Sequence, residues 1–174
     1  MLSKQELTTP IHWGQVADLL QKNKWFLVTA ESCTGGLISA ACTDLAGSSN
    51  WFERGFVTYS NDAKTEALGV DAALIAKEGA VSEAVARAMA LGALGHSRAQ
   101  VAVAVTGVAG PTGGSRLKPV GTVWFGFALP GQPAGHPVKV VSEVQRFDGD
   151  RAAVRAATVR HVLQRLIELL PPAH

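Results

Sequence analysis

The chain has few cysteines, few charged residues and no long apolar run, and each shortage excludes a class of protein. Its 2 cysteines, Cys33 and Cys42, fall on one expected turn and helix, which is poor spacing for a disulfide framework. Charged residues make up 17% with a net charge of +2, and no Lys or Arg run marks a nucleic-acid surface. No segment has the length of a membrane span or the layout of a signal peptide. We therefore expect a soluble, cytoplasmic protein without nucleic-acid or membrane partners.

The residues that are abundant indicate an α/β protein. Hydrophobic residues make up 47% and glycines number 18, as in domains whose helices pack closely on a sheet. We treat residues 1–174 as one domain, a three-layer α/β/α sandwich with a mixed sheet, because the last two strands are too close in sequence for a crossover. Helices are expected from near Thr8-Thr9-Pro10 to Asn23 and at 34–45, 61–68, 71–78, 82–94 and 150–170, and strands around Leu27 and at 52–59, 100–106, 121–129 and 138–147.

The turn at 29–36 carries the first candidate chemistry, since it places Ser32, Cys33 and Thr34 between a strand and a helix. A helix N-terminus there would offer N–H groups to an anion or an oxyanion. Ser32 is a candidate nucleophile, and Cys33 could be the nucleophile itself. Alternatively, Ser32 or Thr34 simply caps the helix.

A serine nucleophile needs a base, and none of the five histidines is well placed to serve. Lys64 is the better candidate, because a desolvated lysine loses its charge more easily and Ser-Lys dyads are a recognised variant of the triad. Tyr59 precedes it at a strand end and could relay the proton or orient the substrate. The plain alternatives are a solvated lysine and a half-buried packing tyrosine.

The glycine-rich segment 107–115 follows a buried strand that ends at Thr106. It lacks the Lys-Ser/Thr ending of a P-loop, but its N–H groups could form a nest for an anion; the alternative is a flexible connecting loop. Near the last helix, capping by the 148–150 segment is the preferred interpretation. Arg146, Arg151 and Arg155 could also reach the anionic ligand of a neighbouring subunit.

Six segments in order resemble the CinA C-terminal domain family, the nicotinamide mononucleotide amidohydrolases: AESCTGG (30–36), AGSS (46–49), GFVTYSN (55–61), GAVS (79–82), AVTGVAGP (104–111) and KPVGTV (118–123). The resemblance implies the same sandwich fold and hydrolysis of the carboxamide of nicotinamide mononucleotide, without metal or cofactor, for pyridine nucleotide salvage. It further implies a stand-alone form and a homo-oligomer, a dimer or larger. Arg116-Leu117 departs from the family pattern in the substrate loop.

By the matching motifs, Ser32 would be the nucleophile, Lys64 its base and Tyr59 a relaying or orienting hydroxyl. The remaining residues that the resemblance assigns to substrate binding are Cys33, Thr34, Gly35, Gly36, Ser48, Asn61, Thr106, Gly107, Ala109 and Gly110.

Two rival functions remain at the level of sequence. One is a silent module that binds a pyridine nucleotide and acts through a partner. The other is a metal-dependent phosphoester or pyrophosphate hydrolase, for which Glu31, Glu53 and Asp62 make a thin carboxylate cluster.

Overall fold

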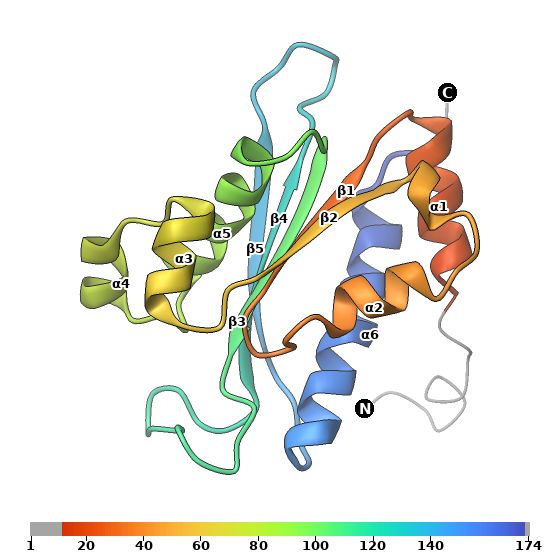
Figure 1. Cartoon of the computed structure of the whole chain (residues 1–174). Coiled ribbons are helices and arrows are strands. Elements are labelled where there is room, and N and C mark those ends of the chain that lie inside the picture. Colours follow the sequence, from red (N-terminus) through yellow and green to blue (C-terminus); the bar gives the residue numbers. More distant parts are fainter. Residues whose placement is uncertain (1–11, 173–174) are drawn as a thin grey trace.

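A five-stranded mixed sheet forms the centre of the computed structural model, which describes residues 12–172 (Figure 1). Its strand order is β2-β1-β3-β4-β5. Strand β1 pairs in parallel with β2 and with the central strand β3, whereas β4 runs antiparallel to both β3 and β5. The mixed sheet expected from the short final connection is therefore confirmed. The strands are β1 (Leu27–Glu31), β2 (Phe52–Val57), β3 (Val101–Gly107), β4 (Thr122–Leu129) and β5 (Lys139–Arg146).

Helices cover both faces of the sheet, which confirms the three-layer α/β/α sandwich (Figure 1). No helix within residues 12–172 is long and apolar enough to cross a membrane. One face carries α1 (Trp13–Lys22), α2 (Leu37–Thr43) and α6 (Arg151–Leu169), and the other carries α3 (Asn61–Leu68), α4 (Ala72–Glu78) and α5 (Glu83–Gly95); a short 3-10 turn, η1 (Ser48–Asn50), precedes β2.

Successive side chains of β3 point to opposite faces of the sheet, so that each helical layer packs on a different set of them. Val101, Val103 and Val105 belong to the core cluster shared with α1, α2 and α6. Ala102 and Ala104, which point the other way, belong to the cluster beneath α3, α4 and α5. Small residues on this second face let α5 approach the sheet closely.

Local end signals placed most helices correctly. Gly69 ends α3 in the left-handed conformation with φ +68°. Ser82 caps α5 by accepting a hydrogen bond from the N–H of Val85, and Asp150 caps α6 by accepting one from Ala153. The predicted ranges of α3, α4 and α5 agree with the structure to within one residue.

The predicted start of the second helix at Thr34 is wrong, because α2 begins at Leu37. Gly35 and Gly36 both adopt positive φ, +58° and +105°, and this pair holds the chain out of the helix for three further residues. Gly36 occupies the N-cap position, so neither Ser32 nor Thr34 caps this helix. The expected start of the first helix at Thr8-Thr9-Pro10 lies outside the described residues.

Strand direction gathers the candidate residues at one edge of the sheet. The carboxyl ends of β1, β2 and β3 lie together because these strands are parallel. The end of β5 reaches the same edge, since two antiparallel steps restore the direction of β3. Chain order also reverses across β1, and open α/β sheets bind ligands beside such a point.

Candidate active site

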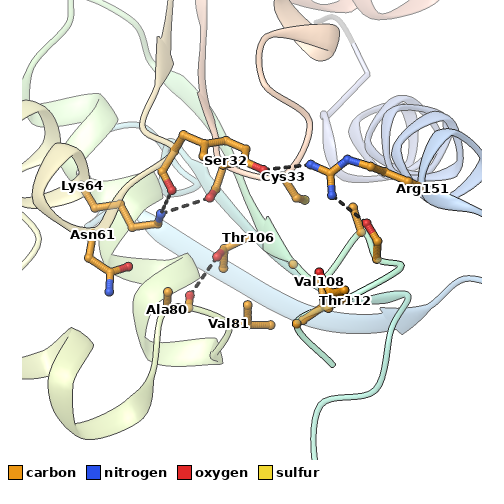
Figure 2. A pocket seen from close by; sticks show the side chains of 15 residues that line it. Ser32, Cys33, Asn61, Lys64, Ala80, Val81, Thr106, Val108, Thr112 and Arg151 are labelled. Atoms are coloured by element: carbon orange, nitrogen blue, oxygen red, sulfur yellow. Dashed lines mark hydrogen bonds between the residues drawn. The ribbon is translucent and has the colours of Figure 1, made fainter. Parts of the chain in front are cut away.

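A cavity of about 360 Å³ opens at this edge (Figure 2). Among residues 12–172, no aspartate or glutamate lines it, and the lysine and arginine that do are Lys64 and Arg151. A site of this composition favours an anionic ligand. The residues that line the cavity are Ser32, Cys33, Tyr59, Asn61, Lys64, Ala80, Val81, Thr106, Gly107, Val108, Ala109, Gly110, Thr112, Gly113 and Arg151.

Ser32 and Lys64 are in direct contact in the cavity wall. The Nζ of Lys64 donates a hydrogen bond to the Oγ of Ser32 at 3.0 Å, across 32 residues of sequence (Figure 2). Ser32 follows the last residue of β1, while Lys64 lies in the first turns of α3, whose start is fixed by the cap from Ser60. A nucleophile and a base at this separation can exchange a proton directly.

The surroundings of Lys64 favour its neutral form. Lys64 is only 1% exposed. Its other acceptors are uncharged backbone carbonyls, those of Thr58 at 2.9 Å, Tyr59 at 3.3 Å and Ser60 at 3.4 Å. None of the ion pairs among residues 12–172 includes this lysine. Burial therefore lowers the pKa of Lys64 below that of an ordinary lysine, and no carboxylate opposes the shift.

Cys33 lies beside Ser32 but is poorly suited to act as a nucleophile. The residue is 5% exposed, and burial raises the pKa of its thiol to about 11. Since the thiolate is the reactive form, this burial disfavours Cys33 as a nucleophile at neutral pH. Cys33 still contributes to the lining of the cavity.

Glu31 organises the turn that carries Ser32, a role that sequence reasoning missed. Its fully buried carboxylate accepts hydrogen bonds from the hydroxyl of Thr34 at 2.6 Å and the N–H of Ile38 at 2.8 Å. It also accepts from the N–H of Ser39 at 3.0 Å and from its hydroxyl at 2.7 Å. A negative charge at the start of α2 complements the helix dipole. Glu31 thereby takes the place of the absent side-chain cap.

Of the two backbone N–H groups directly after Ser32, the first belongs to the cavity residue Cys33, whereas Thr34 is fully buried and does not line the cavity. The N–H of Ser32 donates to the carbonyl of Val105, and that of Gly35 donates to the carbonyl of Ser32, both at 3.1 Å. In the part of the chain that the structure describes, the N–H groups of Cys33 and Thr34 have no hydrogen-bond acceptor. The N–H of Cys33 can therefore stabilise an oxyanion formed next to Ser32.

Tyr59 is hydrogen-bonded to Arg151, which also lines the cavity. The sequence favours helix capping as the role of the segment just before Arg151. Arg151 donates from Nη2 to the hydroxyl of Tyr59 and from Nη1 to the carbonyl of Gly110, both at 2.8 Å (Figure 2). The Tyr59 hydroxyl is thus engaged with Arg151 rather than with Ser32 or Lys64. This arrangement favours an orienting role over proton relay.

The glycine-rich loop forms the wall opposite Lys64. The hydroxyl of Thr106 donates to the carbonyl of Ala80 at 2.8 Å, which ties the end of β3 to the segment before α5. Gly107, Ala109 and Gly110 line the cavity as expected. The departure at Arg116-Leu117 lies away from it: Leu117 is 90% exposed and neither residue contributes to the lining.

Four expected substrate-binding residues do not line this cavity. The Thr34 hydroxyl is bound to Glu31, and Gly35 and Gly36 shape the turn behind it. Ser48 lies in η1 before β2, at the amino end of β1, whereas Ser32 follows its carboxyl end. The AGSS segment gave no indication of which edge of the sheet it occupies.

Comparison with known proteins gives a consistent result. The CinA C-terminal domain model matches residues 12–170. "Nicotinamide-nucleotide amidohydrolase PncC" of Enterobacter agglomerans is 53% identical over 150 residues, which cover 86% of this chain and 88% of that protein. The protein of the same name from Escherichia coli K12 is 50% identical over 152 residues, covering 87% and 88%.

Solved structures agree in fold. A CinA superfamily protein from Klebsiella pneumoniae superposes with a TM-score of 0.82 at 40% identity, covering 97% of this chain and 98% of that one. The competence/damage inducible protein CihA from Agrobacterium tumefaciens gives 0.77 at 45% identity, covering 90% and 96%. The sequence matches extend over the sheet, the candidate site and α6. The chain belongs to the CinA C-terminal domain family.

Proposed function

We propose that this protein hydrolyses the carboxamide of nicotinamide mononucleotide to nicotinate mononucleotide and ammonia. The observation that carries the proposal is the contact of 3.0 Å between Ser32 and the buried Lys64, in a cavity to which the described part of the chain contributes no acidic side chain. The substrate follows from relatives about half identical to this chain whose names specify nicotinamide-nucleotide amidohydrolase.

Acylation begins when the neutral amine of Lys64 takes the hydroxyl proton of Ser32. The serine oxygen attacks the carboxamide carbon, and the N–H group of Cys33 holds the resulting oxyanion. One such donor is worth roughly a hundredfold or more in rate. As the C–N bond breaks, Lys64 returns its proton to the departing nitrogen, so that ammonia leaves and an acyl-serine ester remains.

Deacylation repeats these steps with water as the nucleophile. Lys64 takes a proton from water, and the hydroxide attacks the ester carbon. The C–O bond to Ser32 then breaks, the serine oxygen is reprotonated by Lys64, and the carboxylate product is released. The substrate gains one water and loses one ammonia, so that no oxidant or other co-reactant is required.

Serine is preferred to cysteine on two physical grounds. Lys64 contacts the oxygen of Ser32, and burial raises the pKa of Cys33 to about 11. The decisive experiment measures ammonia and nicotinate mononucleotide release by the wild type, Ser32→Ala and Cys33→Ala, with excess chelator present.

We expect the wild type and Cys33→Ala to turn over, and Ser32→Ala to lose roughly three orders of magnitude or more in kcat. A reversed pattern would assign the nucleophile to Cys33. Activity abolished by the chelator would indicate a metal-dependent hydrolase. Binding of the mononucleotide without release of ammonia would indicate a binding module.

A further inference from the structure

Arg151 is the cation of the cavity that the hydrolytic steps do not use. The other basic residue of the lining, Lys64, is buried and donates hydrogen bonds to Ser32 and to three backbone carbonyls. Arg151 is exposed at the start of α6. Figure 2 shows the two residues on opposite sides of the Ser32–Cys33 turn. The cavity therefore has one basic residue, Lys64, beside the reacting group and a permanent cation, Arg151, away from it.

The guanidinium of Arg151 is held in place but is not neutralised. Both of its hydrogen-bond partners, the Tyr59 hydroxyl and the Gly110 carbonyl, are uncharged. Among residues 12–172, no carboxylate forms an ion pair with it. Arginine has five N–H donors, so three remain for a ligand after these two bonds. A fixed cation with spare donors is suited to bind an oxyanion in bidentate fashion.

The glycine-rich loop offers further donors on the same side of the cavity. Gly110, Thr112 and Gly113 line the cavity, and in the described part of the chain their N–H groups have no acceptor. Gly110 and Gly113 have positive φ, +85° and +86°. Pro111 has no N–H, so the two successive N–H groups of the kind that form an anion nest are those of Thr112 and Gly113. The Gly110 carbonyl is also the group that fixes Arg151. Arginine and loop thus form one connected surface.

We propose that Arg151, with the N–H groups of the Gly110–Gly113 loop, binds the 5′-phosphate of the mononucleotide substrate. This inference rests on the proposed function and adds a determinant of specificity to it. Binding the phosphate away from Lys64 fixes the far end of the substrate and directs its carboxamide toward Ser32. Such orientation supplies rate as well as affinity. The enzyme should consequently discriminate against the nucleoside that lacks the phosphate.

The test compares nicotinamide mononucleotide with nicotinamide riboside as substrates for the wild type, Arg151→Met, Arg151→Lys and Arg160→Met. Arg160 is the matched control, because it is an exposed arginine farther along the same helix. We expect Arg151→Met to lose about 10- to 100-fold in kcat/KM for the mononucleotide, the scale of a lost charge-assisted contact, and little for the riboside. Arg151→Lys should recover part of the loss, and Arg160→Met should match the wild type.

Equal losses on both substrates would overturn the proposal and make Arg151 a support for Tyr59 and the loop. Unchanged kinetics in Arg151→Met would place the phosphate elsewhere. Calorimetric titration of both ligands separates this inference from the proposed function, since it needs no turnover. If the wild type releases no ammonia, the phosphate-dependent difference in affinity must still shrink in Arg151→Met; if it does not, the inference fails independently.

Discussion

Burial of its side chain makes Lys64 a candidate base, although lysine is ordinarily a cation. Lys64 is 1% exposed, and the hydrogen-bond acceptors of its Nζ are carbonyl and hydroxyl oxygens. Desolvation penalises the charged form and lowers the pKa, without a nearby carboxylate to restore it. The free amine is then more abundant at moderate pH than in an exposed lysine.

This environment predicts the pH dependence of activity. Below the pKa of Lys64 the amine is protonated and cannot accept the Ser32 proton, so kcat/KM should rise with pH and level off above that pKa. The midpoint should lie below the ordinary lysine value of 10.5. Initial rates over a range of pH test this. Lys64→Arg should be inactive throughout, because a guanidinium does not deprotonate.

A midpoint at or above 10.5, or substantial activity in Lys64→Arg, would contradict the assignment of Lys64 as base. Stability offers an independent check. Since the folded pKa is the lower one, the unfolded chain binds more protons between the two values, and the free energy of unfolding should increase with pH through that window. This increment should be absent from Lys64→Met.

Glu31 predicts a joint effect on stability and turnover. Each of its oxygens accepts one backbone N–H, from Ile38 or from Ser39. In Glu31→Gln the amide nitrogen must face one of these donors, whichever way the side chain turns. One unsatisfied buried group costs about 1–3 kcal/mol. For a chain of this size we expect a Tm lower by roughly 2–12 °C, together with a reduced kcat because the Ser32 turn loses its support.

Thermal unfolding and steady-state kinetics measure both effects. Glu66→Gln is the control, since Glu66 is an exposed glutamate on α3. Wild-type Tm and kcat in Glu31→Gln would show that the turn does not need this carboxylate.

At the scale of elements, packing of α5 against α3 depends on one glycine. A Cβ at Gly92 would lie 2.1 Å from the carbonyl oxygen of Leu68, the last residue of α3, whereas a Cβ at Gly95 would meet nothing within 4 Å. Gly92→Ala should therefore destabilise the fold by about 1–3 kcal/mol. Gly95→Ala should be neutral or stabilising by up to about 1 kcal/mol, because alanine favours the helix.

Denaturant titration of the two variants measures this difference. Gly92→Ala should also lower kcat, since the helix it displaces carries Lys64. Equal free energies of unfolding in both variants would show that α3 can move away from α5 without loss of stability.

Sequence patterns predicted those elements whose ends are marked locally. Three of these end signals act within three residues of the chain: the caps at Ser82 and Asp150 and the left-handed Gly69. They can therefore be recognised from the sequence without knowledge of the fold. The pattern failed at α2, where the positive φ of Gly35 and Gly36 delays the helix. There the N–H of Ile38 donates to the carboxylate of Glu31, seven residues before it. Helix periodicity carries no information about such a contact.

The composition of the site was less predictable than its elements. Strand order decides which segments meet, and the chain order of the strands differs from their order in the sheet. The pair of Arg151 and Tyr59 spans 92 residues, so no local pattern could join them. Ser48 does not line this cavity, because the segment before β2 lies at the other edge of the sheet. Family motifs identified Ser32 and Lys64, but only the fold brings them into contact.

At the scale of the whole molecule, the cavity depends on both helical layers. Its residues come from the ends of β1 and β3, from α3 on one face and from α6 on the other. The two core clusters lie on opposite faces of the same sheet, and each supports part of the wall. A ligand that contacts Ser32, Lys64 and Arg151 together therefore links the two layers, and its binding energy should appear as stability of the entire fold.

This linkage predicts that nicotinamide mononucleotide raises the Tm of Ser32→Ala, in which the substrate can bind but does not react. At a ligand concentration 100 times Kd the stabilisation is about 2.7 kcal/mol, which corresponds to roughly 5–11 °C for a chain of this size. Scans at fixed protein concentration measure the shift. Adding Arg151→Met to Ser32→Ala should reduce it, because the phosphate loses its cation. The contrary outcome is that calorimetry detects binding while the thermal unfolding transition separates into two, one of them at the Tm of the ligand-free protein. That result would show that the two helical layers are not coupled through the site.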